Sequence, residues 1–252
     1  MAGAHPGKTR LDRLLLEREL ADSREKAQAL ILAGHVLVDE QKVEKCGAQV
    51  RLKAALRLVG EPMKYVSRGG LKLEGALEHF RLDVDGKICL DIGASTGGFT
   101  DCLLQRGAAR VFAVDAGTNQ LAWKLRRDSR VMSLEKTNAR YLKFDRLGGR
   151  VEFVAIDVSF ISVTLILPVL PPLLASRADV LVLVKPQFEV GKGQVGKGGI
   201  VRDPQLHEEA VAKVSSKLLG LGFTQLASAE SVLPGAEGNR EYFLHAIWRK
   251  PG

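Results

Sequence analysis

Three charged side chains stand at the ends of apolar runs, where they could move a proton. Asp157 follows the run 154–156, Lys185 follows the run 180–184, and Glu241 opens the apolar run near the C-terminus. A carboxylate orients a lysine amine by charge-assisted hydrogen bonds, and the amine can then receive or shield the proton of a weak nucleophile. Taken singly, each is more often a solvated or snorkelling charge. Their meaning therefore depends on where the strands place them.

The segment 86–101, GKICLDIGASTGGFTD, could hold an adenosine-like ligand. An apolar run, 88–92, meets a turn that contains Gly93, Gly97 and Gly98, and a helical pattern follows. Strand, glycine turn and helix form the nucleotide-binding start of a doubly wound sheet. Glycine lets the backbone approach a ligand closely because it has no Cβ. The alternative is an ordinary α/β turn.

A carboxylate about 20 residues past this turn, Asp115, ends the next apolar run and can accept both ribose hydroxyls. The turn reads G-A-S-T-G-G and not G-x-G-x-x-G, so the residues favour an adenosine-bearing cofactor without selecting which one. A dinucleotide and a methyl donor both remain open at this point.

The elements that must position these residues alternate between strand and helix. Strands are expected at 87–92, 110–115, 130–134, 152–157, 178–184, 222–231 and 241–248, and helices at 67–80, 97–106, 118–127, 162–174 and 204–220. Alternation predicts a mainly parallel α/β sheet covered on both faces. Only a turn separates the last two strands, so they pair antiparallel at one edge. The carboxyl ends of parallel strands surround the ligand crevice of such a sheet.

The first 60 residues have a different, α+β pattern. Thr9 and Asp12 predict a capping pair for a first helix, and Ser23 and Gly34 mark the start and stop of a second. Short strands follow, so we expect a small domain over 1–60, a linker over 61–66 and a larger domain over 67–252.

The segment SREKAQALILAGHVLVDEQKV resembles the S4 RNA-binding domain, and the resemblance covers residues 9–58. It implies that the helix pair presents Arg10, Arg13, Arg24 and Lys26 to structured RNA. Interleaved acidic residues leave a solvated charged face as the alternative. The hairpin turn is Asp39-Glu40 rather than the common Asn-Gly, which leaves its geometry open.

The larger domain is similar to class I, Rossmann-like methyltransferases, which have a seven-stranded, mainly parallel sheet with an antiparallel edge strand. LDIGASTGGFTD resembles the S-adenosylmethionine loop of FtsJ-type ribose methyltransferases. This resemblance implies that Asp115 binds the ribose and Asn138, in KTNAR, the adenine edge. The other implied cofactor residues are Asp91, Gly93, Ala94, Ser95, Thr96, Gly97, Gly98 and Phe99.

Lys72 joins the three strand-end charges to match, in chain order, the Lys-Asp-Lys-Glu tetrad of ribose 2′-O-methyltransferases. The whole chain resembles the TlyA family, which joins an S4 domain to an FtsJ-like methyltransferase, through SRGGLKLEGAL, LDIGASTGGFTD, IDVSFIS, VKPQFE and GNREYF. The resemblance implies methylation of cytidine ribose in 23S rRNA, with 16S rRNA as a further expected substrate. Lys185 would act on the hydroxyl proton, and Lys72 would supply a neighbouring positive charge. Asp157 and Glu241 would orient the amines.

The segment 191–198, GKGQVGKG, matches G-x-x-x-x-G-K, but Gly198 stands where a phosphate-binding loop needs Ser or Thr. We instead expect Lys192 and Lys197 to contact RNA phosphates near Lys185. Arg68 is a further expected RNA contact.

Composition limits the class of protein. The 252 residues carry a net charge of +8, which suits a polyanionic partner. The N-terminus has no secretory pattern, no apolar run spans a bilayer, and the three cysteines lack metal or disulfide spacing, so we expect a cytoplasmic protein that needs no metal. Two alternatives remain: an RNA-binding module without turnover, and a membrane-active haemolysin, the common label of the family.

Overall fold

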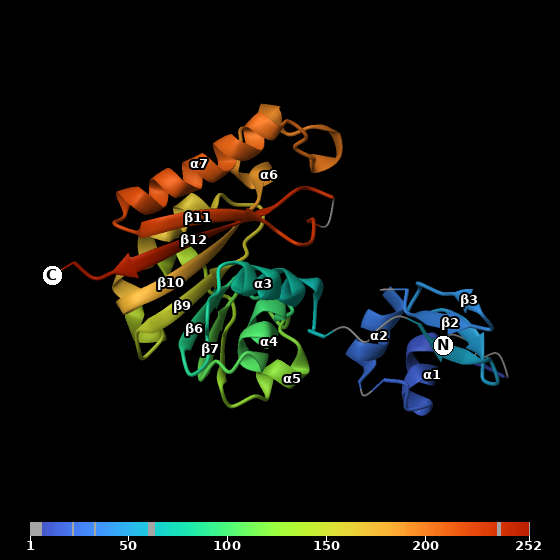
Figure 1. The fold of residues 1–252 in the computed structure, drawn as a ribbon. Coiled ribbons are helices and arrows are strands. Elements are labelled where there is room, and N and C mark those ends of the chain that lie inside the picture. The colour runs from blue at the N-terminus through green and yellow to red at the C-terminus, as the bar shows by residue number, and fades with distance from the viewer. Residues whose placement is uncertain (1–6, 22, 33, 60–63, 236–237, 252) are drawn as a thin grey trace. The chain divides into compact units, whose positions relative to one another are not determined.

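The computed structural model describes residues 7–21, 23–32, 34–59, 64–235 and 238–251. The chain divides into two compact units, Met1–Pro62 and Met63–Gly252. Both are drawn in Figure 1.

The first unit packs two short helices on small antiparallel strands. Its elements are β1 (Lys8–Arg10), α1 (Leu11–Glu17), α2 (Arg24–Leu32), β2 (Val36–Val38), β3 (Gln41–Lys42), β4 (Gln49–Arg51) and β5 (Leu56–Leu58). Ser23 caps α2 through its Oγ, which accepts from Lys26 N at 3.2 Å, and Gly34 ends that segment at φ +70°. Both features confirm what the residue pattern predicted.

Two local details of this unit needed the structure. The predicted Thr9–Asp12 cap is wrong, because Thr9 pairs with Val50 in the β1–β4 ladder and Arg10 immediately precedes α1. The turn between β2 and β3 places Asp39 at φ 50° and Glu40 at φ 63°. Two left-handed residues make the tight hairpin turn that Asn-Gly usually forms.

The second unit is built on a seven-stranded sheet in the order β11-β12-β10-β9-β6-β7-β8. The strands are β6 (Ile88–Ile92), β7 (Arg110–Val114), β8 (Val131–Leu134), β9 (Val151–Ile156), β10 (Leu174–Val184), β11 (Thr224–Glu230) and β12 (Tyr242–Arg249). Strands β6 to β10 pair in parallel, whereas β12 pairs antiparallel with both β10 and β11. The predicted sheet is confirmed, with the antiparallel strand second from the edge and β11 outermost.

Helices cover both faces of this sheet (Figure 1). On one face, α3 (Arg68–His79) and α4 (Gly98–Gln105) bury a cluster that includes Leu73, Leu103 and Phe153. On the other, α7 (Pro204–Gly220) packs over a cluster that includes Val214 and Val154. Because strand side chains alternate between faces, the position of a residue along its strand decides which cluster it joins.

Two predicted helices are not continuous α-helices. The segment 162–174 forms three 3₁₀ turns, Val163–Leu165, Leu167–Val169 and Pro171–Leu173, because its prolines cannot donate backbone hydrogen bonds. The segment 118–127 contains only α5 (Trp123–Arg126), and Asn119 before it is left-handed at φ 57°.

The predicted linker 61–66 is shorter at its C-terminal end. Tyr65 is 2% exposed and packs in the cluster beneath α3, so 64–66 belongs to the second unit. Residues 61–63 lie outside the described residues.

Candidate active site

Three parallel strands end side by side at the centre of the sheet. The registers of β6 with β7 and with β9 align the last residues of these strands. The residues that follow, Gly93, Asp115 and Asp157, therefore meet at one edge. This is the edge at which doubly wound sheets bind ligands.

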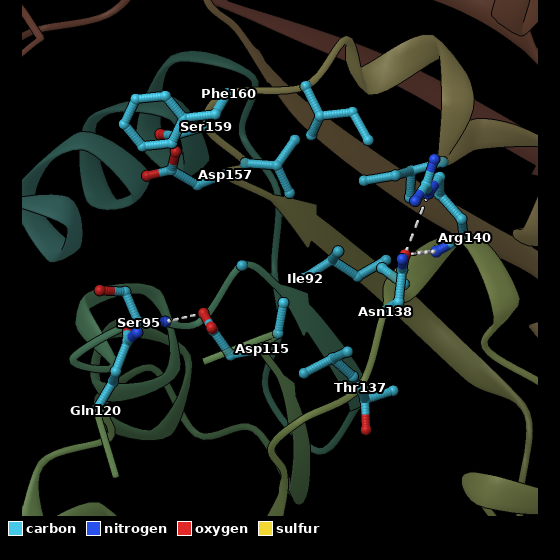
Figure 2. A pocket seen from close by; sticks show the side chains of 17 residues that line it. Ile92, Ser95, Asp115, Gln120, Thr137, Asn138, Arg140, Asp157, Ser159 and Phe160 are labelled. Atoms are coloured by element: carbon cyan, nitrogen blue, oxygen red, sulfur yellow. Dashed lines mark hydrogen bonds between the residues drawn. The ribbon is translucent and has the colours of Figure 1, made fainter. Parts of the chain in front are cut away.

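A cavity of about 450 Å³ opens at this edge, within the size range of small-molecule sites. In Figure 2, Asp157, Ser159 and Phe160 lie toward one end, and Asn138 and Arg140 lie toward the other. Its lining residues are Ile92, Gly93, Ser95, Val114, Asp115, Ala116, Gln120, Thr137, Asn138, Ala139, Arg140, Asp157, Val158, Ser159, Phe160, Ile161 and Ile166.

The glycine turn places backbone directly against the neighbouring strand ends. Gly93 has φ +87°, and a Cβ there would clash with the backbone carbonyl of Asp157. Ser95, at φ 48°, donates its backbone N–H to Asp115 Oδ2 at 2.8 Å. Asp115 Oδ1 accepts from Gly117 N at 2.6 Å. A carboxylate has about four acceptor positions, so Asp115 can still accept hydroxyl donors from a ligand.

The other two glycines of the turn serve packing. A Cβ on Gly97, at φ +95°, would clash with Leu125, and one on Gly98 would clash with Ser67 at the start of α3. Both positions therefore let α4 approach its neighbours.

The cavity wall holds four of the ten cofactor residues that the resemblance implied. These four are Gly93, Ser95, Asp115 and Asn138. The remaining six are not among the lining residues: Asp91 lies in β6, Ala94, Thr96 and Gly97 lie in the turn, and Gly98 and Phe99 begin α4. Their cofactor roles stay predictions.

Asp91 lies within β6, directly beneath the turn. It is fully buried and accepts a 2.6 Å hydrogen bond from Thr100 Oγ1, while its Oδ1 atom has no hydrogen-bond partner among the described residues. Burial raises the pKa of Asp91 to about 7. A buried acceptor without a partner is costly, so this atom marks a place where a donor would stabilise the site.

The four tetrad residues form two lysine–carboxylate pairs. Lys185 forms an ion pair with Asp157 and donates to Ser159 Oγ at 3.0 Å. Lys72 Nζ lies 2.6 Å from Glu241 Oε2, with side chains 10% and 3% exposed.

Both pairs belong to the same face and the same edge of the sheet. Asp157, Lys185 and Glu241 each lie two positions along the strand direction from a residue of the cluster beneath α3 and α4. Residues two apart on a strand share a face. Lys72 comes from α3, the helix that covers this face. The register of β10 with β12 also brings the positions of Lys185 and Glu241 next to each other.

Two residues at the cavity mouth were not predicted from the sequence as site residues. Ser159 contacts Lys185, and Phe160 is 92% exposed with a left-handed φ of 66°. The ring of Phe160 lies 5.4 Å from that of Phe188. Both Ser159 and Phe160 stand in the IDVSFIS motif, so a polar-aromatic pair directly after a strand was the available signal. No comparable signal marked Gln120 or Arg140.

In the first unit, one buried carboxylate organises two of the predicted RNA contacts. Asp12 is 0% exposed and accepts from Arg10 Nε at 2.9 Å, from Arg24 Nε at 3.3 Å and from Gln28 at 3.1 Å. The arginine side chains remain 44% and 60% exposed. The other two predicted contacts, Arg13 and Lys26, are exposed, and Arg13 pairs with Glu17.

The remaining predicted RNA contacts lie in the second unit. Arg68 and Lys197 are exposed, and the Lys192 side chain lies outside the described part. The segment 191–199, which we call the basic loop, is separated from β10 by α6 (Pro186–Glu189). It therefore lacks the direct strand-to-loop connection of a phosphate-binding loop. No helix in the described ranges is long and apolar enough to cross a membrane.

Comparison with known proteins agrees with this geometry. The FtsJ-like methyltransferase family model matches residues 65–247, and the S4 domain model matches 9–54. The 16S/23S rRNA (cytidine-2′-O)-methyltransferase TlyA of Mycobacterium tuberculosis is 50% identical over 94% of this chain and 89% of its own length. Hemolysin A of Brachyspira hyodysenteriae is 44% identical over 94% of this chain and 99% of its own. A solved Streptococcus thermophilus protein, described as a candidate hemolysin, matches with a TM-score of 0.75 and 44% identity over 98% of this chain and 90% of its own.

Proposed function

Because the chain belongs to the FtsJ-like methyltransferase family and carries an S4 domain, we propose that it methylates ribosomal RNA. The substrate is the 2′-hydroxyl of cytidine in 23S rRNA, with 16S rRNA as a second target, and the methyl donor is S-adenosylmethionine. The observation that carries this proposal is the presence of two lysine–carboxylate pairs on one face of the sheet, one of which reaches the cavity wall through Asp157.

The residues of the cavity fit an adenosine-bearing methyl donor. Asp115 offers carboxylate oxygens to ribose hydroxyls, and Asn138 lies toward the far end, in reach of a base edge (Figure 2). The close backbone approach at Gly93 suits the polar methionine end. When bound, S-adenosylmethionine supplies a methyl group on a sulfonium, whose positive charge is lost on transfer.

The tetrad supplies what a ribose hydroxyl needs. A 2′-hydroxyl is a poor nucleophile, so Lys185 receives its proton or shields the developing negative charge on oxygen. Asp157 and Ser159 hold the Lys185 amine in place from the cavity wall. Lys72 adds a positively charged ammonium group at the same edge, where Glu241 holds it in place. The oxygen forms its bond to the methyl carbon as the carbon–sulfur bond breaks, so the residues contribute chiefly by in-line positioning.

RNA recognition is shared between the two units. The first unit presents Arg10 and Arg24 to phosphates, as its S4 match and their exposure suggest. At the cavity mouth, Phe160 offers an exposed ring on which an unstacked base could lie. A ribosomal substrate implies a cytoplasmic location.

Replacement of Lys185 by Ala tests the function directly. We expect the variant to bind S-adenosylmethionine as the unmodified protein does, because Lys185 is not a lining residue, but to lose methylation of ribosomal subunits. Full-rate methylation by Lys185→Ala would overturn the mechanism. An unmodified protein that binds RNA but never transfers a methyl group would instead be the RNA-binding module.

A further inference from the structure

We propose that Asn239 is a positioning residue that ties the basic loop to the segment carrying Glu241, and so sets where Lys197 meets RNA. Only the last part, contact between Lys197 and RNA, rests on the proposed function. The anchoring itself stands on contacts within the second unit.

The Asn239 side chain holds the last residue of the basic loop, Gly199, and Val201 just beyond it. Asn239 is 1% exposed. Its Oδ1 accepts from Val201 N at 2.9 Å, and its Nδ2 donates to Gly199 O at 2.9 Å. One amide thus replaces the donor and acceptor that a neighbouring strand would offer. Because Val201 is 2% exposed, loss of its bond would leave a buried N–H without a partner, whereas Gly199 is exposed and its carbonyl can accept from water.

A second buried side chain fixes the same point. His207 of α7 is 4% exposed, and its Nε2 lies 2.8 Å from Val201 O while its Nδ1 lies 3.0 Å from the hydroxyl of Tyr242. Val201 is therefore held through its N–H and its carbonyl. These contacts connect Val201 to Asn239 and, through His207, to Tyr242, and both residues lie within two positions of Glu241.

The local structure around Glu241 connects the anchor to the tetrad. The carbonyl of Asn239 accepts from Gly235 N at 2.8 Å. A Cβ at Gly235 would clash with the Glu241 carboxylate, so this backbone lies directly against the tetrad side chain. Displacing Asn239 would therefore move the loop end relative to the Lys72–Glu241 pair.

The composition of the basic loop explains why it needs an anchor. Glycine loses more conformational freedom on ordering than any other residue. The loop contains Gly191, Gly193, Gly196, Gly198 and Gly199, of which the last two have φ +77° and +76°. Lys197 is exposed and stands two residues before the anchored Gly199. Its position is thus governed largely by the anchor.

Trypsin tests the anchor without any need for activity. We expect Asn239→Ala to speed cleavage after Lys197 by about tenfold or more, as loss of one buried and one partly buried hydrogen bond implies. Asn239→Asp keeps the acceptor for Val201 and loses the donor to Gly199. Its rate of cleavage after Lys197 should therefore fall between those of the unmodified protein and Asn239→Ala. Cleavage after Lys45, in the first unit, serves as the internal control. Unchanged cleavage after Lys197 in both variants would overturn the anchor.

Methyl-transfer kinetics then test the positioning. Asn239→Ala should raise the KM for ribosomal subunits about tenfold, with affinity for S-adenosylmethionine changed less than about twofold. In the double variant with Lys197→Ala, Asn239→Ala should raise the KM little further, because the effects of residues that act through one contact are not additive. Full additivity, or an unchanged KM despite faster cleavage, would overturn the positioning role. If neither the unmodified protein nor any variant methylates RNA, the proposed function is wrong. The trypsin result would still decide whether Asn239 anchors the basic loop.

Discussion

Lys72 Nζ lies 2.6 Å from Glu241 Oε2 in a pair almost removed from water. Breaking such a pair by removing one partner costs about 3–5 kcal/mol, whereas replacing both by apolar residues is often neutral. We therefore expect Lys72→Met to lower the free energy of unfolding strongly and the double variant Lys72→Met/Glu241→Leu to recover most of the loss.

Urea unfolding of the two variants measures this difference, and methyl-transfer assays complete the comparison. Both variants should be inactive, so stability and activity would separate. A Lys72→Met protein as stable as the unmodified one would show that the pair is not buried as described.

Phe160 combines a left-handed backbone with a 92% exposed ring. A left-handed non-glycine residue costs on the order of 1–2 kcal/mol, and glycine relieves this while adding disorder to the unfolded chain. Phe160→Gly should therefore leave the free energy of unfolding within about 1 kcal/mol of the unmodified value. Loss of a base-stacking surface worth about 1–3 kcal/mol should lower kcat/KM for RNA by roughly tenfold or more.

Phe160→Leu is the matched control, because it keeps the strained backbone and loses only the ring. Its kcat/KM for RNA should be as low as that of Phe160→Gly, and its free energy of unfolding should be no higher than that of the unmodified protein. Full-rate methylation by either variant would exclude the ring from substrate binding.

Asp91 should make the stability of the second unit depend on pH. Burial raises its pKa from 3.8 to about 7, so its contribution to stability is complete below pH 3.8 and is lost as the pH rises through about 7. The slope from this group is at most about 1.4 kcal/mol per pH unit. Asp91→Asn removes this pH dependence, so the variant should gain stability relative to the unmodified protein as the pH rises from about 4 to about 7.

Thermal unfolding across that pH range, without cofactor, measures the gain. Thr100→Val is a useful companion, because it removes the one hydrogen bond that the carboxylate accepts from a side chain and leaves the carboxylate in place. Parallel stability curves for Asp91→Asn and the unmodified protein would contradict the prediction.

Asp12 should have the opposite pH dependence in the first unit. Hydrogen bonding from Arg10 holds the pKa of Asp12 well below its ordinary 3.8, so its stabilisation is present above that pH and is lost as the pH falls below it. Asp12→Asn should destabilise the unit by roughly 3 kcal/mol at pH 7, since charge-assisted hydrogen bonds contribute about 1.5–3 kcal/mol each. RNA affinity should fall as well, because Arg10 and Arg24 lose their common support.

Glu17→Gln provides the control. It breaks only the exposed Arg13–Glu17 pair, which should change stability by less than about 1 kcal/mol. Chemical unfolding and RNA titration of both variants suffice. Equal effects of the two substitutions would mean that burial of Asp12 has no special role.

The strand ends were predictable because each follows a continuous apolar run, as at 88–92, and because parallel strands share an edge. The helix predicted at 162–174 failed for a local reason, since its apolar residues dominated the pattern while its prolines broke the backbone bonding. The roles of Gly97 and Gly98 could not be read from the sequence. They depend on Leu125 and Ser67, which approach only in the folded chain.

Some residues of the site could likewise be predicted from the sequence, and others required the tertiary structure. Asp115 and Asp157 could be located from the sequence because each directly follows a strand. The exposure of Phe160 could not, because it depends on a left-handed turn that sterics disfavour for an aromatic residue. The partners of Lys72 and Lys185 required tertiary structure, since Lys72 and Glu241 are 169 residues apart in the chain.

Insertion of β12 between β10 and β11 has a consequence for biosynthesis. The strand that Glu241 precedes is translated after β11, yet it lies between β10 and β11 in the sheet, and Glu241 completes a pair with a residue from the first helix of its unit. A nascent chain that has emerged only through β11 holds the strands around the cavity but lacks half of its buried charge pair. Catalytic competence should thus arise in one step, once β12 has joined the sheet, and not gradually during synthesis.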